Sequence, residues 1–156
     1  MKEHLYRTFL QWTGNKGQGT SNYRAYDRAY EIEVEGKPII SGSSDPAFRG
    51  DKTKYNPEEL LVASLSSCHM LWYLHLCAEI GVTVISYSDR AIGKMSEIED
   101  GSGRFKEVLL KPEIVINADS NLEKARQLHH QAHKFCFIAN SVNFPVLCQP
   151  SILLDT

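Results

Sequence analysis

Apolar and polar residues alternate in the first third of the chain in a way that predicts β-strands. The alternation is rough over residues 4–12 and clean over residues 30–34. Every second side chain of a strand faces the same side, so such a pattern builds one apolar face. A turn at residues 35–38 follows, and the polar residues 41–55, with Pro46 and Gly50, are expected to form a loop.

A long apolar stretch predicts a helix over residues 57–80. Asn56 followed by Pro57 is typical of a helix start, and Gly81 supplies the stop. Apolar positions lie nearly all round this helix, which predicts a central buried helix. Serines, two histidines and Glu79 interrupt the stretch, and a bilayer would penalise them, so we expect no membrane span.

The second half of the chain predicts two more strand segments, a second helix and a last strand. Residues 82–95 and 105–117 are rich in Val, Ile and Tyr and flank a turn signal at residues 99–103. Ser120 to Glu123 resembles a capping box that opens a helix ending near residues 138–140. Residues 144–154 predict a strand that Pro150 interrupts, which favours an edge position or a bulge.

Composition limits the classes of protein to consider. The chain has 156 residues, of which 42% are hydrophobic, so it can bury one sizeable core, and we expect a single domain over residues 1–156. The net charge of -2, with mixed signs, leaves no basic stripe for nucleic acid. Lys2, Glu3 and Arg7 stand where a secretory signal needs apolar residues, so a cytoplasmic location is expected.

Four cysteines, Cys68, Cys77, Cys136 and Cys148, lie far apart without C-x-x-C spacing. In a reducing cytosol they are expected to be thiols, and any disulfide is expected to be catalytic and not structural. A cysteine in an apolar setting is usually an inert small hydrophobe, and we interpret Cys77 and Cys148 in this way. Cys136 differs because it lies where an amphipathic helix enters a loop, so it could move.

The histidines raise the question of a metal. His129 and His133 have i, i+4 spacing with His130 beside them, but the Glu of the zincin signature is missing. We therefore expect no metal, and interpret these side chains as solvent-facing or as hydrogen-bonded within the core. His69 and His75 on the predicted buried helix are expected to hydrogen-bond across a packed interface.

Two runs of the sequence resemble the OsmC/Ohr family of osmotically inducible and organic hydroperoxide resistance proteins, in its OsmC-like branch. Residues 56–70 begin with Asn-Pro-Glu and reach Cys68 at a fixed spacing, and residues 133–140 contain Cys136 at the end of a helix. The resemblance implies an α+β, OsmC-like fold of antiparallel sheets with two long helices, the central one buried. It also implies an intertwined homodimer with its sites at the dimer interface.

The resemblance assigns roles to three residues. Cys68 matches the peroxidatic cysteine of the family, Cys136 its resolving cysteine, and Glu58 the carboxylate that orients an arginine beside the reactive sulfur. On the predicted helix, Glu58 and Cys68 are separated by about 15 Å along the axis, so any coupling between them needs a bridging side chain.

The bridging arginine has three candidates. Arg49 is at nearly the position used in the OsmC branch, whereas Arg24 or Arg28 would fill the role from an earlier loop, as in the Ohr branch. Arg24, Met70 and Phe137 are the expected substrate-binding residues, and two departures from the family concern Met70 and Phe137. Met70 lies in a segment where many relatives carry Phe after the cysteine, and Phe137 follows Cys136 where many relatives carry proline.

The implied function is that of a cysteine-based organic hydroperoxide reductase in oxidative-stress defence. It would reduce organic hydroperoxides to alcohols through a Cys68 sulfenic acid and a Cys68–Cys136 disulfide, with no cofactor. The expected partners are a second copy of the chain, an organic hydroperoxide and a dithiol reductant, lipoyl-type or other. Two alternatives stay open: a non-catalytic dimeric stress protein that binds an apolar ligand in the interface cleft, and a metal-dependent hydrolase using His129, His130 or His133.

Overall fold

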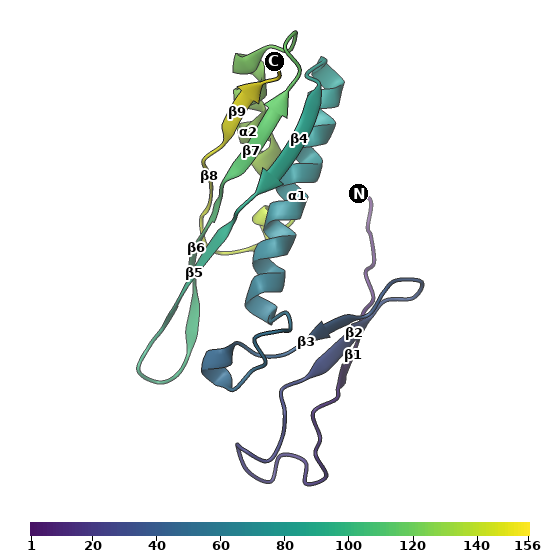
Figure 1. The fold of residues 1–156 in the computed structure, drawn as a ribbon, viewed down its shortest axis with the longest axis vertical. Helices are drawn as coiled ribbons and strands as arrows, with labels where there is room; N and C mark the ends of the chain where they lie inside the picture. Colours follow the sequence, from purple (N-terminus) through teal and green to yellow (C-terminus); the bar gives the residue numbers. More distant parts are fainter. The chain divides into compact units, whose positions relative to one another are not determined.

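The computed structural model describes all residues 1–156 (Figure 1). The chain divides into two compact units, Met1–Leu60 and Leu61–Thr156, which are described separately. The first unit contains an antiparallel sheet in the order β1-β2-β3, with β1 at Phe9–Trp12, β2 at Tyr30–Glu33 and β3 at Ile40–Gly42. The first two strands confirm the alternation in the sequence. The third was not predicted, and it overlaps the start of the segment expected to be a loop.

Helix α1 spans Pro57–Ile80, as the sequence predicted. Its start is capped by Asn56, whose side-chain oxygen accepts the Glu59 backbone N–H at 2.8 Å. Its end is made by Gly81 at φ 79°, a left-handed conformation that glycine adopts without strain. The Val82 N–H then donates to the Cys77 carbonyl at 2.9 Å and closes the last turn.

Only one face of α1 is buried in the chain, which corrects the expectation of a helix buried all round. The buried residues Leu65, His69, Tyr73 and Cys77 are four positions apart and form a single stripe. Leu71, outside the stripe, is 62% exposed. By length and composition α1 could also cross a membrane. Core helices of soluble proteins also have this length and composition. In the structure, the buried stripe of α1 packs against the other elements of the chain.

The second unit contains three long strand segments, and each is broken into two strands: β4 and β5, β6 and β7, and β8 and β9. One sheet has the order β4-β7-β9 and the other β5-β6-β8. The predicted strand segments are therefore confirmed in position but divided. Their bounds are Val84–Asp89 (β4), Ile92–Glu97 (β5), Gly103–Leu110 (β6), Pro112–Ile116 (β7), Val146–Cys148 (β8) and Ser151–Leu154 (β9).

The breaks have local causes. The Asp89 carboxylate accepts the Lys111 backbone N–H at 2.7 Å, which withdraws that donor from the strand ladder. Pro112 and Pro150 have no N–H to donate. Pro150 separates β8 from β9, and both of these are edge strands, as its presence predicted.

Two of the strand pairs are parallel, which corrects the expectation of purely antiparallel sheets. Strand β8 pairs with β6, and β9 with β7, in the same direction. The chain passes through a helix between β7 and β8, and such a crossover returns it parallel to the strand it left. The unit is therefore a mixed α+β structure with two helices, in agreement with the predicted class.

The crossover helix α2 spans Leu122–Phe135. Its N-cap is Asn121, whose side-chain oxygen accepts the Lys124 N–H at 2.9 Å. The hydroxyl of Ser120, the residue predicted to open the capping box, instead accepts the Thr83 N–H. The helix ends at Phe135, earlier than expected, and Cys136 is its C-cap before the 3-10 turn Ala139–Ser141.

Both helices pack onto the β4-β7-β9 sheet, beside which α1 runs in Figure 1. A smaller core lies toward the start of α1 against β6 and consists of Leu65, Val108 and Leu110. This packing fixes the two helices against one sheet and so determines which of their side chains meet. The larger core contains Tyr73, Cys77, Val82, Ile114, Ile116, Ala125, Leu128, Ala132 and Ile152.

Candidate functional site

The two cysteines singled out from the sequence are neighbours in the second unit. Cys68 lies on α1 and is half-buried, and Cys136 lies at the end of α2 and is 1% exposed. Burial raises the pKa of the Cys136 thiol to about 11, and a hydrogen bond and charge interaction with the Cys68 thiol add to the rise. The Cys68 and Cys136 thiols are therefore neighbours.

The end of α2 supplies hydrogen-bond donors to the Cys136 sulfur. The Ala139 backbone N–H donates to Sγ at 3.4 Å, and bonds from Ala139 and Ile138 oppose the rise in the Cys136 pKa. Desolvation outweighs them, so Cys136 is a protonated thiol at neutral pH. The thiol is therefore held in its protonated, uncharged form at the start of the turn that follows α2.

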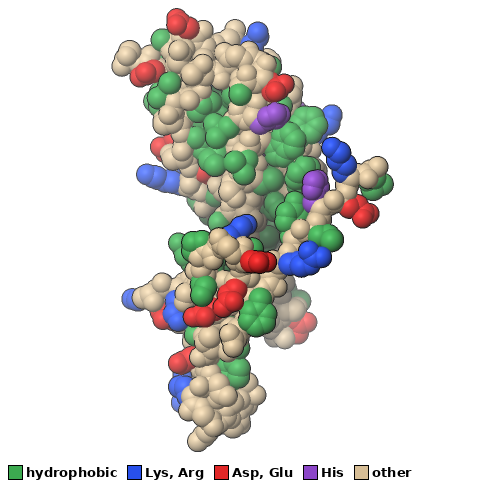
Figure 2. Space-filling model, turned by 90° about the vertical axis from the view of Figure 1, so that its right-hand side faces the viewer, with side chains coloured by type: hydrophobic (Ala, Val, Ile, Leu, Met, Phe, Trp, Pro, Cys, Tyr) green, Lys and Arg blue, Asp and Glu red, His purple; other side chains and the backbone are tan.

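An aromatic surface adjoins the thiol pair. The Trp72 ring stacks on Phe135 with centroids 5.3 Å apart and meets Phe137 edge-on at 5.6 Å. A hollow of about 250 Å³ is lined by Leu71, Trp72 and His75. Leu71, Trp72 and His75 follow Cys68 by three, four and seven positions, which share its face of the helix. Figure 2 shows hydrophobic side chains gathered on this unit, with histidine among them.

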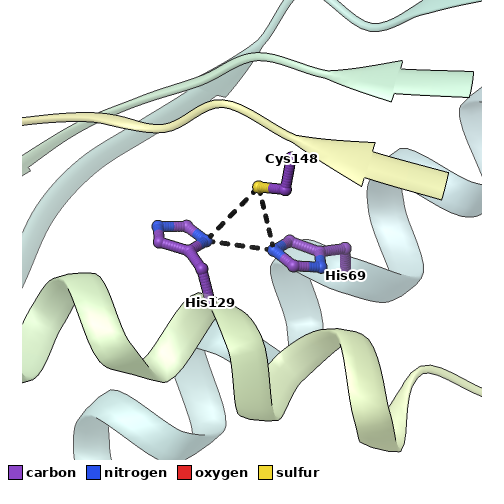
Figure 3. Close-up of side chains that lie close together, drawn as sticks. All are labelled: His69, His129 and Cys148. Carbon is purple, nitrogen blue, oxygen red and sulfur yellow. Dashed lines mark hydrogen bonds between the residues drawn. The ribbon is translucent and has the colours of Figure 1, made fainter.

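A second group of reactive side chains converges inside the same unit. His69 on α1, His129 on α2 and Cys148 on β8 point toward one another (Figure 3). The His69 Nε2 atom lies 3.0 Å from His129 Nδ1, and the Cys148 sulfur lies 3.7 Å and 3.8 Å from these two nitrogens. The hydrogen bond between the two imidazoles bears out the expectation that His69 bonds across a packed contact.

The surroundings of this group are apolar. Burial lowers the pKa of His69 to about 4 and that of His129 to about 3, so both imidazoles are neutral at pH 7. Burial, helped by the nearby Asp89 carboxylate, raises the pKa of the Cys148 thiol to about 12. The Tyr73 ring stacks on His129 with centroids 3.9 Å apart. The cluster is thus a set of three neutral donors held by packing.

The sequence did not reveal this cluster. Cys148 was interpreted as an inert core residue, and His69, His129 and Cys148 come from three separate elements without a common motif. The three histidines considered for a metal, by contrast, do not form a ligand set. His130 and His133 are exposed on α2, whereas His129 is buried on the side that faces α1.

The remaining predicted site residues lie mainly in the first unit. Glu58, in the first turn of α1, has a buried Oε2 atom with no hydrogen-bond partner. The Arg28 guanidinium donates to the Tyr26 and Tyr23 carbonyls, each at 2.6 Å, and packs over both rings. The role of Glu58 and the choice of arginine stay predictions.

Arg49 lies 5.9 Å from the Tyr23 ring centroid and has a left-handed backbone at φ 62°, and Arg24 is exposed. In the second unit, Met70 is half-buried on α1 and Phe137 is 65% exposed. Substrate binding by Met70 and Phe137 stays a prediction, as do the roles of Arg49 and Arg24.

The arrangement of strands and helices matches known proteins. The model of the OsmC-like protein family matches residues 50–150. The chain belongs to the OsmC-like family. A solved OsmC-like protein of unknown function from Vibrio cholerae is 32% identical, with a TM-score of 0.85 over 97% of this chain and 100% of the other. A comparison with curated proteins finds no match.

More distant solved structures share the OsmC-like fold. An organic hydroperoxide resistance protein from Elizabethkingia anophelis is 18% identical, with a TM-score of 0.67 over 99% of this chain and 100% of the other. One from Legionella pneumophila is also 18% identical, with a TM-score of 0.66 over 97% of this chain and 99% of the other. The predicted family is therefore confirmed, and it includes proteins associated with resistance to organic hydroperoxides.

Proposed function

We propose that this OsmC-like chain is a thiol-dependent peroxidase that reduces organic hydroperoxides in oxidative-stress defence. The single observation that carries the proposal is the proximity of the Cys68 and Cys136 thiols at facing positions of α1 and α2. One sulfur is half-exposed and can meet a substrate, while the other is buried and protonated. This division suits an attacking and a resolving cysteine.

The reaction balances with these two thiols and an external dithiol. The Cys68 thiolate attacks the O–O bond, takes one oxygen as a sulfenic acid and releases an alkoxide, which gains a proton to become the alcohol. The Cys136 thiol then condenses with the sulfenic acid, forming the S–S bond and releasing water. A dithiol, lipoyl-type or other, reduces this disulfide by exchange and restores both thiols.

The substrate preference follows from the surface beside Cys68. Trp72, Phe135 and Phe137 offer an apolar, aromatic contact, which favours alkyl or aryl hydroperoxides over hydrogen peroxide. Met70 and Phe137 are proposed to contact the organic group. Leu65, three positions before Cys68 on α1, is fully buried in the core and does not reach the surface.

Activation of Cys68 requires a positive charge that stabilises the thiolate. Arg49 is proposed for this role, with Arg24 and Arg28 as alternatives, and Glu58 as the carboxylate that orients it. The buried, unpartnered Oε2 atom of Glu58 is an acceptor suited to an arginine. Arg28 already donates to two carbonyl groups and would have to give up bonds to act here.

A homodimer is proposed because the chain exposes a large apolar face. Leu71 on α1 is a large hydrophobic side chain left in solvent, as are Phe135 and Phe137, which pack against Trp72 beside it. Monomeric proteins seldom expose a contiguous surface of this kind. A second copy with the same face would cover it symmetrically. The protein is expected to act in the cytoplasm, where dithiols are available.

The test is a peroxidase assay with cumene hydroperoxide and either dihydrolipoamide or dithiothreitol. Cys68→Ser should abolish turnover, and Cys136→Ser should allow one turnover before reduction fails or over-oxidation follows. Cys77→Ser, a buried cysteine away from the pair, is the matched control and should retain the wild-type rate. Arg49→Met, Arg24→Met and Arg28→Met compared in the same assay identify the activating cation. Wild-type rates in Cys68→Ser would refute the proposal.

A second candidate function rests on a pocket in the first unit. A cavity of about 380 Å³ is lined by apolar side chains, with Arg28 as its charged residue, and is large enough for a small organic ligand. It favours a non-catalytic protein that binds an apolar molecule. The lining consists of Leu10, Trp12, Arg28, Tyr30, Ile32, Pro57 and Leu60.

The two candidates differ in one observation. Treatment with one equivalent of cumene hydroperoxide should yield a Cys68–Cys136 cross-linked peptide by mass spectrometry if the chain is a peroxidase. A binding protein would form no such cross-link, and would instead bind an environment-sensitive apolar dye that competes with its ligand.

A further inference from the structure

His69, His129 and Cys148 carry chemistry that the proposed peroxidase does not use. Neither Cys68 nor Cys136 belongs to this group, and its three donor atoms all lie within 4.8 Å of one another. We propose that His69 Nε2, His129 Nδ1 and Cys148 Sγ form a binding site for a divalent metal ion of the zinc class. The proposal goes beyond the peroxidase function and does not depend on it.

The spacing of the donor atoms fits such an ion. Zinc bonds imidazole nitrogen at about 2.05 Å and thiolate sulfur at about 2.3 Å. With these lengths, the 3.0 Å between the nitrogens corresponds to an angle of about 94° at the ion. The sulfur distances of 3.7 Å and 3.8 Å correspond to about 116° and about 122°.

The three angles together amount to about 332°, close to the value of about 328° for three ligands of a tetrahedron. The donor distances are therefore compatible with an ion just outside the plane of the three donors. Three protein ligands leave the fourth position for water or another small ligand.

The donor types also select the metal class. Imidazole nitrogen with thiolate sulfur is typical of zinc, whereas magnesium and calcium take oxygen ligands. On binding, two nitrogen–metal bonds and one sulfur–metal bond form, and Cys148 releases its proton to solvent. Both imidazoles stay neutral, each with its proton on the ring nitrogen that points away from the ion.

The surrounding charge favours a cation. A doubly charged ion with one thiolate carries a net charge of +1. The Asp89 carboxylate is near enough to act on both His69 and Cys148, whereas His133 acts on His69 in the opposite sense. Asp89 is itself held by hydrogen bonds from the Ser66 hydroxyl at 2.6 Å and the Lys111 N–H. A fixed negative group beside the site offsets the remaining positive charge.

Packing holds two of the ligands in place before any ion binds. His69 and His129 are 1% and 5% exposed, and the Tyr73 ring, anchored by its bond to the Ala125 carbonyl, stacks on His129. Cys148 is half-buried, so the site lies at the margin of the core. Ligands fixed in this way lose little freedom on binding, which favours affinity.

The test uses cobalt(II) as a spectroscopic probe of the full-length protein, reduced and first treated with a chelator. One equivalent should bind per chain, with visible bands of tetrahedral intensity and a near-ultraviolet charge-transfer band from a single thiolate. Zinc(II) should displace the cobalt and raise the melting temperature. Absence of a thiolate-to-cobalt band would overturn the proposal.

Variants identify which sulfur binds the metal. The double variant Cys68→Ser/Cys136→Ser should keep the cobalt spectrum, because it leaves the proposed ligands intact. Loss of the band in this variant would assign the metal to the thiol pair and overturn the proposal. Cys148→Ser should lose the charge-transfer band and weaken cobalt binding by more than about 100-fold, the upper range for loss of an outer-shell partner.

Two controls separate ligand loss from damage to the fold. Cys77→Ser removes another buried thiol, and His130→Gln removes the exposed histidine next to His129, and both should keep the cobalt spectrum. If Cys148→Ser fails to fold by circular dichroism, the double variant still decides, since it does not alter the cluster. A band that persists in folded Cys148→Ser would contradict the assignment.

Discussion

The thiols of the native protein should differ strongly in their reaction with iodoacetamide at pH 7.5. The thiolate is the form that reacts, so its fraction sets the rate. With an ordinary pKa of 9.0 a thiol is about 3% thiolate at this pH, and with the pKa of Cys136 at about 11 the fraction is about 0.03%. Burial should therefore slow Cys136 by about 100-fold, before any effect of restricted access.

The same reasoning ranks the other cysteines. The pKa of Cys148 at about 12 corresponds to a slowing of about 1000-fold, and burial also raises the pKa of Cys77. Cys68 is half-buried and open to the reagent, so it should be labelled first. Peroxide should abolish labelling of both Cys68 and Cys136, because oxidation to the Cys68–Cys136 disulfide would protect both sulfurs from the reagent.

The assay is peptide mapping by mass spectrometry of samples quenched over time, in the metal-free protein. The control is the same reaction in urea, where all four thiols should react at similar rates. In Cys68→Ser, Cys136 should react somewhat faster than in the wild type, since the neighbouring thiol no longer raises its pKa. The reasoning fails if native Cys136 is labelled within about tenfold of its rate in urea.

Three further predictions concern stability and assembly. Because the folded-state pKa values of His69 and His129, about 4 and about 3, lie below the ordinary 6.5, the unfolded chain takes up protons first as the pH falls. The metal-free protein should thus keep its full stability above about pH 6.5. Its free energy of unfolding, measured with urea, should fall by about 2 kcal/mol per imidazole between pH 7 and pH 5. A fall below about 1 kcal/mol would contradict this. Leu65→Ala should lower the free energy of unfolding by about 2–5 kcal/mol, because Leu65 is fully buried, and a loss below about 1 kcal/mol would contradict its core position. Leu71→Glu should convert the proposed dimer to a monomer in sedimentation experiments while circular dichroism is retained, and an unchanged dimer would exclude this face from the interface.

The local sequence was sufficient for the elements that depend on neighbouring residues. Asn56 and Gly81 determined both ends of α1, because capping and a positive φ are requirements of the backbone at those positions. The alternation of residues located β1 and β2, and the Val, Ile and Tyr content around a turn signal located the later strand segments 82–95 and 105–117. The Asn-Pro-Glu run and its spacing to Cys68 indicated the OsmC-like family, which the family model confirms.

Tertiary structure decided what depends on distant parts of the chain. The Pro150 break was predicted from the sequence, but the break beside Lys111 also involves Asp89, whose carboxylate takes a backbone donor from another strand, and no local pattern announces such a bond. The parallel pairing of β8 and β9 follows from the route of the chain through α2. The single buried face of α1 depends on which elements pack on it, whereas composition reports only that the helix is apolar.

The chemistry divides in the same way. Cys68 and Cys136 could be singled out because each lies in a recognisable run of residues, although their proximity appears only once α1 and α2 share a sheet. His69, His129 and Cys148 had no such signal. The sequence does not show in which direction the side chains of distant residues point. The three donors, from two helices and a strand, therefore become a ligand set only when packing brings them together.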